Sequence, residues 1–349
     1  MRIFRRHTFA ATAKAVVFTG VLALAITSVD AFAQTKIRVG KTTGASGFHI
    51  PSYVAMDKGF FKREGLDASY VAMSGKALVG AGMGGAIDFV PIPGGGSQAI
   101  LKGAPIVYLV GESLISQWAI VVDPKIKSVK DLKGKTMGYG RPGGADYDEG
   151  EITLGEFFNM DVGRDYNVIS FQGEPERLAG LIAGSIQAAL MSFPWAAKAQ
   201  IEGFRILLKT GDYLPRVGGT FWVTKEFLKN NRATAKKFIK AIAKATQYLA
   251  SNKDGSVPVI QKYFGIKSKK QAGYIWDTVH DQYGPDIPEN LLLKLFQGRV
   301  KRMQSKGLWP KDKAVPNPEQ FVERELLNEG LREIGYYLQA PPAVQGKLN

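Results

Sequence analysis

Short apolar runs alternate with helical patterns from residue 37 to residue 224, and this alternation limits the possible folds more than any other feature. Strands that are separated by helices form parallel sheets, so an α/β fold is expected. Gly103, Gly184 and Gly203 each stand between a helical pattern and the next strand, which predicts that they cap helix C-termini. Strands are expected at Ile37–Gly40, Ile87–Ile92, Ile106–Val110, Ala119–Val122, Lys135–Gly140, Val168–Phe171, Ile186–Ser192, Arg205–Leu208 and Thr220–Thr224.

The chain changes character after Lys225 and is expected to be helical from there onward. Four lysines crowd the first of these helices, which favours a solvated face over a docking face for a partner. They are Lys236, Lys237, Lys240 and Lys244. Helices are predicted at Arg232–Leu249, Lys269–Tyr283, Ile287–Lys306 and Pro318–Tyr337.

An internal sequence repeat indicates two similar lobes. The segment Lys36–Gly44 aligns with Lys135–Gly143, and their final glycines are 99 residues apart (143 − 44). The segment Gly85–Asp88 aligns with Gly184–Gln187 at the same spacing (184 − 85). Equal spacing of two matching strand–loop elements favours two α/β lobes that each present a glycine-rich loop after the first strand.

The expected strands Ala119–Val122 and Thr220–Thr224 bracket the second lobe and mark two crossings between lobes. Lobe I is therefore expected over residues 34–121 and 220–349, and lobe II over residues 122–219. Ligands of open α/β sheets lie at the carboxyl ends of the strands. Two facing lobes would thus form a ligand cleft with a hinge.

The N-terminus has the three parts of a secretory signal peptide. Three arginines lie within the first six residues, Ala15–Thr27 is an uncharged and mostly apolar run, and Ala31–Ala33 offers small residues for cleavage before Gln34. A membrane anchor would need about 20 apolar residues. We expect residues 1–33 to be removed on export to the periplasm, by the general secretory route rather than the twin-arginine route.

The charge balance and the lack of cysteine narrow the function. The formal charge is +15, and residues 1–33 contribute four basic residues against one acid, which leaves +12. Such a surface favours anionic ligands, and no basic–aromatic motif indicates nucleic acid. The chain contains no cysteine, which excludes disulfides, thiolate metal sites and cysteine nucleophiles. No G-x-S-x-G or P-loop motif is present, so neither catalysis nor a cofactor or metal is expected.

An ordered set of motifs resembles the nitrate/sulfonate/taurine group of periplasmic substrate-binding proteins of ABC importers, with thiamine-pyrimidine-precursor proteins nearby. The resemblance covers about residues 36–250. It implies a type II periplasmic-binding fold: two Rossmann-like lobes, two crossover strands, a cleft between the lobes and a helical C-terminal extension. The motifs are Ile37–Gly40, Tyr53–Leu66, Gly85–Phe89, Leu101–Pro105, Ser128–Lys135 and Leu178–Ala189.

The same resemblance matches the ligand loops of the family to four loops of this chain. Each loop leads into a helix, whose first N–H groups have no intrahelical partner and attract anions. Glycines there let the backbone approach a ligand closely. The candidate ligand residues are Gly44, Ala45, Ser46, Gly47, Phe48 and His49; Gly94, Gly95, Gly96 and Ser97; Arg141, Gly143, Gly144 and Ala145; and Ser192, Phe193 and Trp195.

Several of these residues have a structural alternative. Ser46 and Ser97 could cap helices instead of contacting a ligand. Arg141 could bind a carboxylate or sulfonate through its fork of N–H groups, or it could be a surface arginine or form an inter-lobe ion pair. The aromatic residues Phe48, Phe193 and Trp195 could line a pocket or belong to the core.

Acidic residues qualify the case for an anionic ligand. Asp88 lies at the start of a strand and is interpreted as structural, with Gln187 as its counterpart. Asp146, Asp148, Glu149 and Glu151 begin a helix, where acids suit the dipole. If they faced the cleft, they would weaken the case for a purely anionic solute.

The favoured function is that of a monomeric periplasmic binding protein that delivers a sulfonate, a nitrate-like ion or a carboxylate to an ABC permease. One alternative is an enzyme or pyrimidine-precursor binder that resembles the thiamine-pyrimidine synthases. Those synthases carry a cysteine-rich iron loop that this chain lacks. A second alternative is a solute receptor for a membrane sensor.

Overall fold

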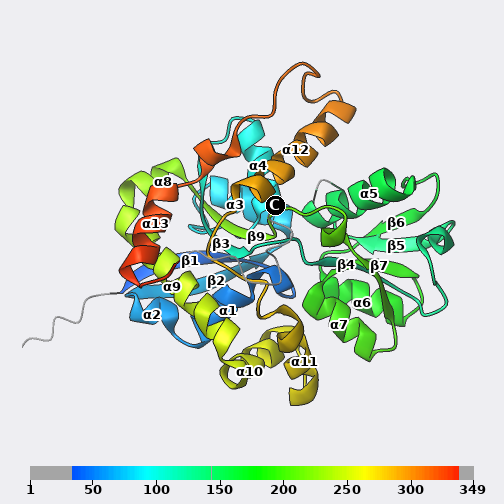
Figure 1. Cartoon of the computed structure of the whole chain (residues 1–349), viewed down its shortest axis with the longest axis horizontal. Helices are drawn as coiled ribbons and strands as arrows, with labels where there is room; N and C mark the ends of the chain where they lie inside the picture. Colours follow the sequence, from blue (N-terminus) through cyan, green and yellow to red (C-terminus); the bar gives the residue numbers. More distant parts are fainter. Residues whose placement is uncertain (1–33, 143, 338–349) are drawn as a thin grey trace, which may run out of the picture. The chain divides into compact units, whose positions relative to one another are not determined.

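Two groups of strands organise the chain, of which a computed structural model describes residues 34–142 and 144–337. Lobe II contains one five-stranded sheet in the order β6-β5-β7-β4-β8 (green in Figure 1). Its strands are β4 (Trp118–Val122), β5 (Thr136–Tyr139), β6 (Asn167–Ser170), β7 (Ala188–Ser192) and β8 (Arg205–Lys209). Lobe I contains the pairs β1 (Thr35–Thr42) with β2 (Leu66–Met73) and β3 (Ile106–Ser113) with β9 (Gly219–Thr224). The expected signal peptide and Gly143 lie outside the described residues.

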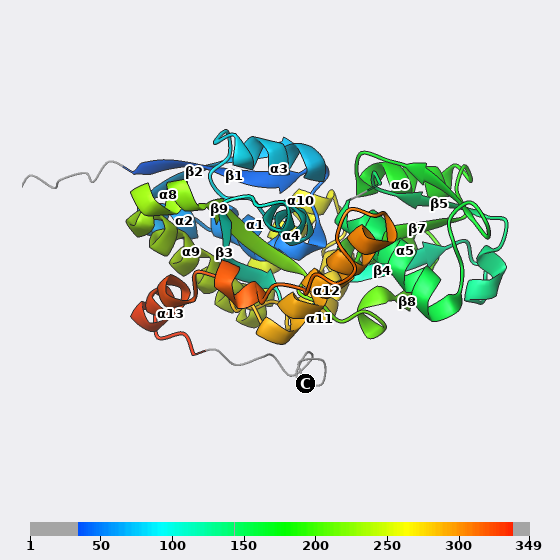
Figure 2. The ribbon, with the colours of Figure 1, turned by 90° about the horizontal axis from the view of Figure 1, so that it is seen from above.

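Helices flank both groups of strands (Figures 1 and 2). Those of lobe II are α5 (Ala145–Phe158), α6 (Glu174–Ile182) and α7 (Phe193–Ile201). Those of lobe I are α1 (Ile50–Asp57), α2 (Phe60–Arg63), α3 (Gly75–Met83), α4 (Pro93–Leu101), α8 (Lys225–Asn230), α9 (Arg232–Ser251), α10 (Lys253–Phe264), α11 (Lys269–Val279), α12 (Glu289–Ser305) and α13 (Arg324–Glu333). Short 3-10 turns occur at η1 (Gly47–His49), η2 (Val129–Leu132), η3 (Thr210–Asp212) and η4 (Pro318–Phe321). None of the helices in the described ranges is long and apolar enough to cross a membrane.

The two lobes are joined by two crossings, as the sequence predicts. The chain enters lobe II between β3 and β4 and returns between β8 and β9. The strands beside these crossings run against their neighbours, so β3–β9, β4–β7 and β4–β8 are antiparallel. The expectation of purely parallel sheets is therefore wrong at the crossings, whereas β1–β2, β5–β6 and β5–β7 are parallel. The predicted fold class is confirmed, and the exact lobe boundaries stay a prediction.

One predicted strand is absent and one strand was missed. Residues 87–92 form only isolated bridges, Val39 with Phe89 and Val90 with Trp222, because Pro91 and Pro93 have no N–H to extend a ladder. These two bridges join the strand pairs of lobe I. β2 was missed: its side chains are mostly half-buried or exposed, and its apolar run is limited to the last four residues, Tyr70–Met73.

The helical C-terminal part is confirmed with three differences. α8 and α10 were missed, and the predicted helix Pro318–Tyr337 is split into η4 and α13. The split occurs because Val322 bridges to Tyr108 and the Glu323 N–H donates to the Tyr108 carbonyl at 2.9 Å. The lysine-rich face of α9 is not simply solvated, since three of its four lysines pair with acids. Those pairs are Lys236 with Glu329 and Glu333, Lys240 with Glu333 and Glu64, and Lys244 with Glu64.

The backbone agrees with two predictions: the glycines that cap helix C-termini and the internal repeat between the lobes. Gly103, Gly184 and Gly203 follow α4, α6 and α7 with φ of +88°, +72° and +93°, the left-handed conformation of a helix end. In lobe I, Asp88 Oδ2 accepts from the Arg38 N–H at 2.7 Å and also pairs with the Arg38 guanidinium. In lobe II, Gln187 Oε1 accepts from the Thr136 N–H at 3.1 Å. Both side chains therefore fasten a corresponding strand of their lobe, β1 in lobe I and β5 in lobe II, which confirms the structural interpretation of Asp88.

Candidate functional site

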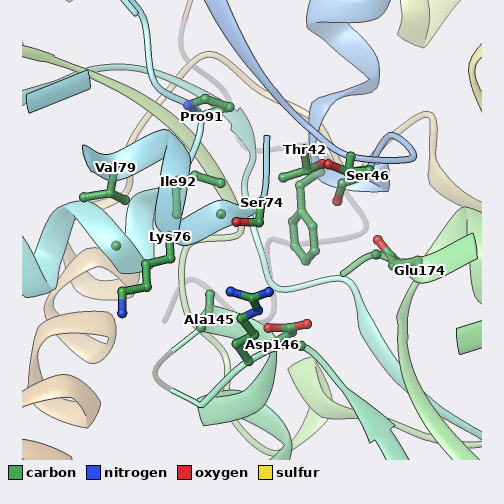
Figure 3. A pocket seen from close by; sticks show the side chains of 18 of the residues that line it. Thr42, Ser46, Ser74, Lys76, Val79, Pro91, Ile92, Ala145, Asp146 and Glu174 are labelled. Carbon is green, nitrogen blue, oxygen red and sulfur yellow. The ribbon is translucent and has the colours of Figure 1, made fainter. Parts of the chain in front are cut away.

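A cavity of ≈ 560 Å³ lies between the two lobes. Figure 3 shows Thr42, Ser46 and Ser74 of lobe I opposite Ala145, Asp146 and Glu174 of lobe II. Most of its wall consists of the segments that follow β1, β2, β5 and β6, which all end at the cavity. This is the position at which open α/β sheets bind ligands, at the carboxyl ends of parallel strands.

The first turns of four helices contribute to the wall. They are Gly75 and Lys76 of α3, Pro93 and Gly95 of α4, Ala145 and Asp146 of α5, and Glu174 and Arg177 of α6. Each helix start carries N–H groups without intrahelical partners and the positive end of the helix dipole. Four such ends around one cavity favour a ligand with negative charge or acceptor oxygens.

Cations outnumber the acids that remain free at the cavity. Lys76, Lys102 and Arg141 line it and pair with no acid in the described part of the chain. Arg177 is bonded to Asp146 and donates to the Leu190 carbonyl at 2.5 Å. This pairing neutralises Asp146, so Glu174 is the remaining acid of the wall.

Glu174 is buried at the start of α6, with 5% of its surface exposed. Its carboxylate accepts from the Ser192 N–H at 2.5 Å and from the Ser192 hydroxyl at 2.9 Å. Burial raises the pKa of Glu174 to about 7, while Arg177 and the Ser192 hydrogen bonds act in the opposite direction. The side chain is therefore partly protonated at neutral pH, which reduces the negative charge in the cavity.

His49 lies in the cavity wall, and its Nδ1 already has a hydrogen-bond partner within the protein. Its Nδ1 is 2.7 Å from Glu112 Oε2, and Glu112 Oε1 accepts from the Ser52 N–H at 3.0 Å. Both side chains are buried. Glu112 lies on β3 and was missed, although an acid at the end of an otherwise apolar strand is a signal that sequence reasoning can use.

The structure brings some of the predicted ligand residues to the cavity wall. These are Ala45, Ser46, Phe48, His49, Gly95, Arg141, Gly144 and Ala145. The wall does not include Gly44, Gly47, Gly94, Gly96, Ser97, Ser192, Phe193 or Trp195. Gly143 lies outside the described residues. Ligand contact itself stays a prediction for all of them.

The glycines of the first loop allow contact between lobes. A Cβ on Gly47 would lie 2.3 Å from Pro194 Cδ, and one on Gly44, where φ is +79°, would lie 2.5 Å from Pro175 Cγ. The Gly47 N–H donates to the Ser192 hydroxyl at 3.1 Å, and the indole of Trp195 donates to the Ala45 carbonyl at 3.2 Å. These residues hold one lobe against the other.

The second predicted loop is in fact the first part of α4, because Pro93 begins the helix. Gly96 packs against Trp222, where a Cβ would be 2.9 Å from the indole ring. The hydroxyl of Ser97 donates to the Gly94 carbonyl at 2.9 Å and is buried. The suggested capping role is wrong for Ser97, and Ser46 makes no side-chain cap bond either.

Most acids at the start of α5 do not face the cavity. Asp148 pairs with Arg299 and Arg302, Glu149 pairs with Arg216, and Glu151 pairs with Arg302. Only Asp146 reaches the wall, and Arg177 neutralises it. The concern that these acids weaken the case for an anionic solute is therefore removed.

Two parts of the wall were not anticipated. Ser74–Lys76 follows β2, the strand that was missed, so its loop was missed with it. Residues 171–174 follow a strand that was predicted and precede a helix with a proline in its first turn. The rule that ligand loops follow parallel strands was sufficient to find this second segment. Within the described ranges, no group of three or more His, Asp and Glu side chains is placed to hold a metal ion.

The two lobes, their two crossings and the cavity between them define a protein of the type II periplasmic-binding fold. A model of the NMT1/THI5-like family matches residues 47–256, more than half of the chain, and the protein belongs to this family. The resemblance drawn from the ordered motifs is thereby confirmed.

Individual comparisons agree with this assignment. The chain is 28% identical over 230 residues to the putative binding protein YtlA of Bacillus subtilis, covering 62% of this chain and 67% of that one. It is 27% identical over 239 residues to the 4-amino-5-hydroxymethyl-2-methylpyrimidine phosphate synthase THI12 of Saccharomyces cerevisiae, covering 59% and 64%. The alkanesulfonate-binding protein SsuA of Xanthomonas axonopodis, solved with MOPS, has the same fold, with a TM-score of 0.67, 16% identity and coverage of 82% and 98%.

Proposed function

We propose that this protein is the solute-binding component of an ABC importer and that it captures a small organic anion between its lobes. The observation that carries the proposal is the inter-lobe cavity, which both lobes line and at which three cations have no acidic partner among residues 34–142 and 144–337. Four helix starts add N–H donors around the same space. The anionic group of the solute would be held by these donors and by the cations.

The size and lining of the cavity favour an organic anion over a bare inorganic ion. A volume of ≈ 560 Å³ lies within the range of about 300–1,000 Å³ that is usual for small-molecule sites. Apolar side chains form part of the wall and would cover an aliphatic or aromatic body. They are Phe48, Val79, Ile92, Trp118 and Phe171. A carboxylate or sulfonate on an apolar body fits this lining better than nitrate.

The test is a thermal-shift and calorimetry screen of residues 34–349, which contain the compact unit of the chain. The panel contains alkane and aryl sulfonates, carboxylates, nitrate and pyrimidines, each beside a neutral analogue of the same shape. A solute at 100 times its dissociation constant should stabilise the protein by about 2.7 kcal/mol. Selective stabilisation by organic anions supports the proposal. Stabilisation by neutral analogues or pyrimidines alone would contradict it.

An enzymatic role is the second candidate, because one relative is named as a pyrimidine phosphate synthase. One observation favours binding: the chain has no cysteine, so it lacks the cysteine-rich iron loop of those synthases. The two roles differ in what happens to the solute. Mass spectrometry of the solute recovered after denaturation should show it unchanged for a binding protein and converted for an enzyme.

The location and partners follow from the same proposal. Residues 1–33 would direct export, cleavage would occur before Gln34, and the closed lobes would present the solute to a membrane permease. N-terminal sequencing of the protein from a periplasmic fraction tests the first two statements. Solute uptake by cells that lack the gene tests the third, since a sensor receptor would leave uptake unchanged.

A further inference from the structure

One arginine bridges the two lobes behind the cavity wall. Arg299 lies on α12 of lobe I and is 5% exposed. Its Nη2 is 3.3 Å from the Gly94 carbonyl in the first turn of α4, and its Nη1 is bonded to Asp148 of α5 in lobe II. The two helix starts touch here, since a Cβ on Gly94 would be 3.1 Å from Ala145 Cβ. Arg299 therefore joins two parts of the wall without lining the cavity.

A second arginine of α12 strengthens the same contact. The Nε of Arg302 is 2.9 Å from Asp148 Oδ1, and its Nη2 forms an ion pair with Glu151. The Arg302 guanidinium also lies 5.8 Å from the centre of the Tyr147 ring. At the edge, Lys301 pairs with Glu156 at 2.8 Å. Every one of these ionic and aromatic partners belongs to α5, and Figure 2 shows α12 beside that helix.

The neighbouring acid of α5 has a different kind of partner. Glu149 accepts from Arg216 at 2.8 and 2.5 Å and from Thr210 at 2.5 Å, and it is also bonded to Ser116. Ser116 belongs to the first crossing, and Thr210 and Arg216 to the second. Glu149 thus ties α5 to the hinge, whereas Asp148 ties α5 to the opposite lobe. Hinge contacts can persist when lobes separate, but the contacts of α12 with α5 must break.

We propose that Arg299 and Arg302 are positioning residues that latch α12 of lobe I onto α5 of lobe II and so set the balance between open and closed lobes. The proposal rests on the proposed solute-binding function, because solute capture needs that balance. A buried ion pair that separates into water loses its attraction but regains hydration, so its net energy is small. The latch therefore allows opening. Removal of either arginine leaves the buried Asp148 with only one of its two cationic partners, which disfavours the closed state.

The balance can be measured without a solute, because the chain has no cysteine of its own. Glu226 in α8 of lobe I and Lys130 in η2 of lobe II are both exposed, so Glu226→Cys with Lys130→Cys gives two unique spin-label positions. Pulsed electron resonance then reports the distance distribution between lobes. In Arg299→Gln and in Arg302→Gln, the distribution should move from the closed population toward longer distances. If a variant shows the same distance distribution as the labelled protein with Arg299 and Arg302 intact, the proposal is wrong.

Two further variants separate a latch from a general effect on folding. Asp148→Leu combined with Arg299→Met removes both charges of the pair, and it should keep the closed population that Arg299→Gln alone loses. If the double variant opens as far as the single one, the pair is not a latch. Arg232→Gln removes an ion pair with Glu323 that lies within lobe I, and it should leave the distribution unchanged. Arg302 is less buried than Arg299, so Arg302→Gln still tests the proposal if Arg299→Gln does not fold.

The solute screen and the label experiment fail independently. If the lobes open in the variants but no anion stabilises the protein, the latch holds and the proposed function is wrong. If an anion binds but the variants show the original distribution, the function holds and the latch is wrong. Where both hold, a tenfold smaller closed fraction should weaken the solute affinity by about tenfold.

Discussion

The two walls of the cavity use their charged residues in opposite ways. Lobe I presents Lys76 and Lys102 with no acidic partner in the described residues. Lobe II presents Asp146 and Glu174, whose charges are already balanced by Arg177 or by partial protonation. The difference teaches that lobe I supplies two of the three unpaired cations of the cavity, whereas lobe II supplies one, Arg141, beside acids whose charges are balanced before a solute arrives.

The two walls also differ in the residue types that form the contact between the lobes. Gly44 and Gly47 of lobe I meet prolines of lobe II at distances that leave no room for a Cβ. Pro175 and Pro194 stand in the first turns of α6 and α7, where proline rings are rigid and well tolerated. The glycine loop of lobe I thus packs against rigid prolines of lobe II.

The largest effect is expected where this contact is blocked. Gly47→Leu places a side chain where Cβ alone would be 2.3 Å from Pro194, so the lobes cannot close on a solute. Affinity for the solute identified by the screen should fall by about 100-fold or more, because the closed fraction sets the apparent affinity. Calorimetry measures the loss. Gly80→Ala is the matched control, since nothing lies within 4 Å of that position, and a retained affinity in Gly47→Leu refutes the role of this contact.

The next effect concerns the charges of lobe I. Lys76→Ala together with Lys102→Ala removes both free cations of that wall, and affinity for an organic anion should fall by about 30-fold, which corresponds to about 2 kcal/mol shared by two exposed cations. The loss should shrink at high salt, because screening weakens the contribution of exposed charges. Lys130→Ala with Lys133→Ala changes the net charge equally on residues outside the wall. Equal losses in the two double variants would show that only net charge matters.

A smaller effect tests the exposed cation of lobe II. Arg141→Ala should weaken binding of a carboxylate or sulfonate by about tenfold, the lower end expected for one charged hydrogen bond. Arg141→Lys keeps the charge but loses the fork, so it should recover only part of the affinity. Titration calorimetry on both variants decides the matter. Unchanged binding in Arg141→Ala assigns the residue to the surface and leaves lobe I as the source of the positive charge.

The sequence predicted the lobes and crossings because these depend on long apolar runs and on glycines with one backbone conformation. Gly184 and Gly203 illustrate this, since a left-handed helix end accepts few other residues. Elements without such a signal were not predicted correctly. β2 is half-exposed, and residues 87–92 read as a strand although two prolines prevent a ladder.

The site was predicted less completely, because its residues meet through contacts far apart in sequence. Ser97 was expected at a loop and lies buried in α4, while Lys102 of the same helix region lines the cavity unpredicted. Local patterns show which segment follows a strand, but not which side of a helix faces the opposite lobe. The ion pair of Asp148 with Arg299 spans 151 residues, and no local pattern indicates it.

The last and smallest effect concerns the acid of lobe II. The pKa of Glu174 is about 7 in the folded protein against its ordinary value of 4.5, because the side chain is buried. Between these two pH values the folded state holds a proton that the unfolded state has released. The associated stability, about 3 kcal/mol, is therefore fully present below about pH 4.5 and is lost as pH rises through about 7. Glu174→Gln cannot titrate, so its unfolding free energy should depend less on pH over that window.

The same titration should appear in binding, because ionised Glu174 adds a negative charge to the wall. Anion affinity should fall a few-fold as pH rises from about 6 to about 8, and Glu174→Gln should remove most of this dependence. Glu176→Gln, on the exposed side of the same helix, is the control and should keep it. If the two variants show the same pH profile, Glu174 does not sense the solute. The positive character of lobe I would then act on the anion without modulation from lobe II.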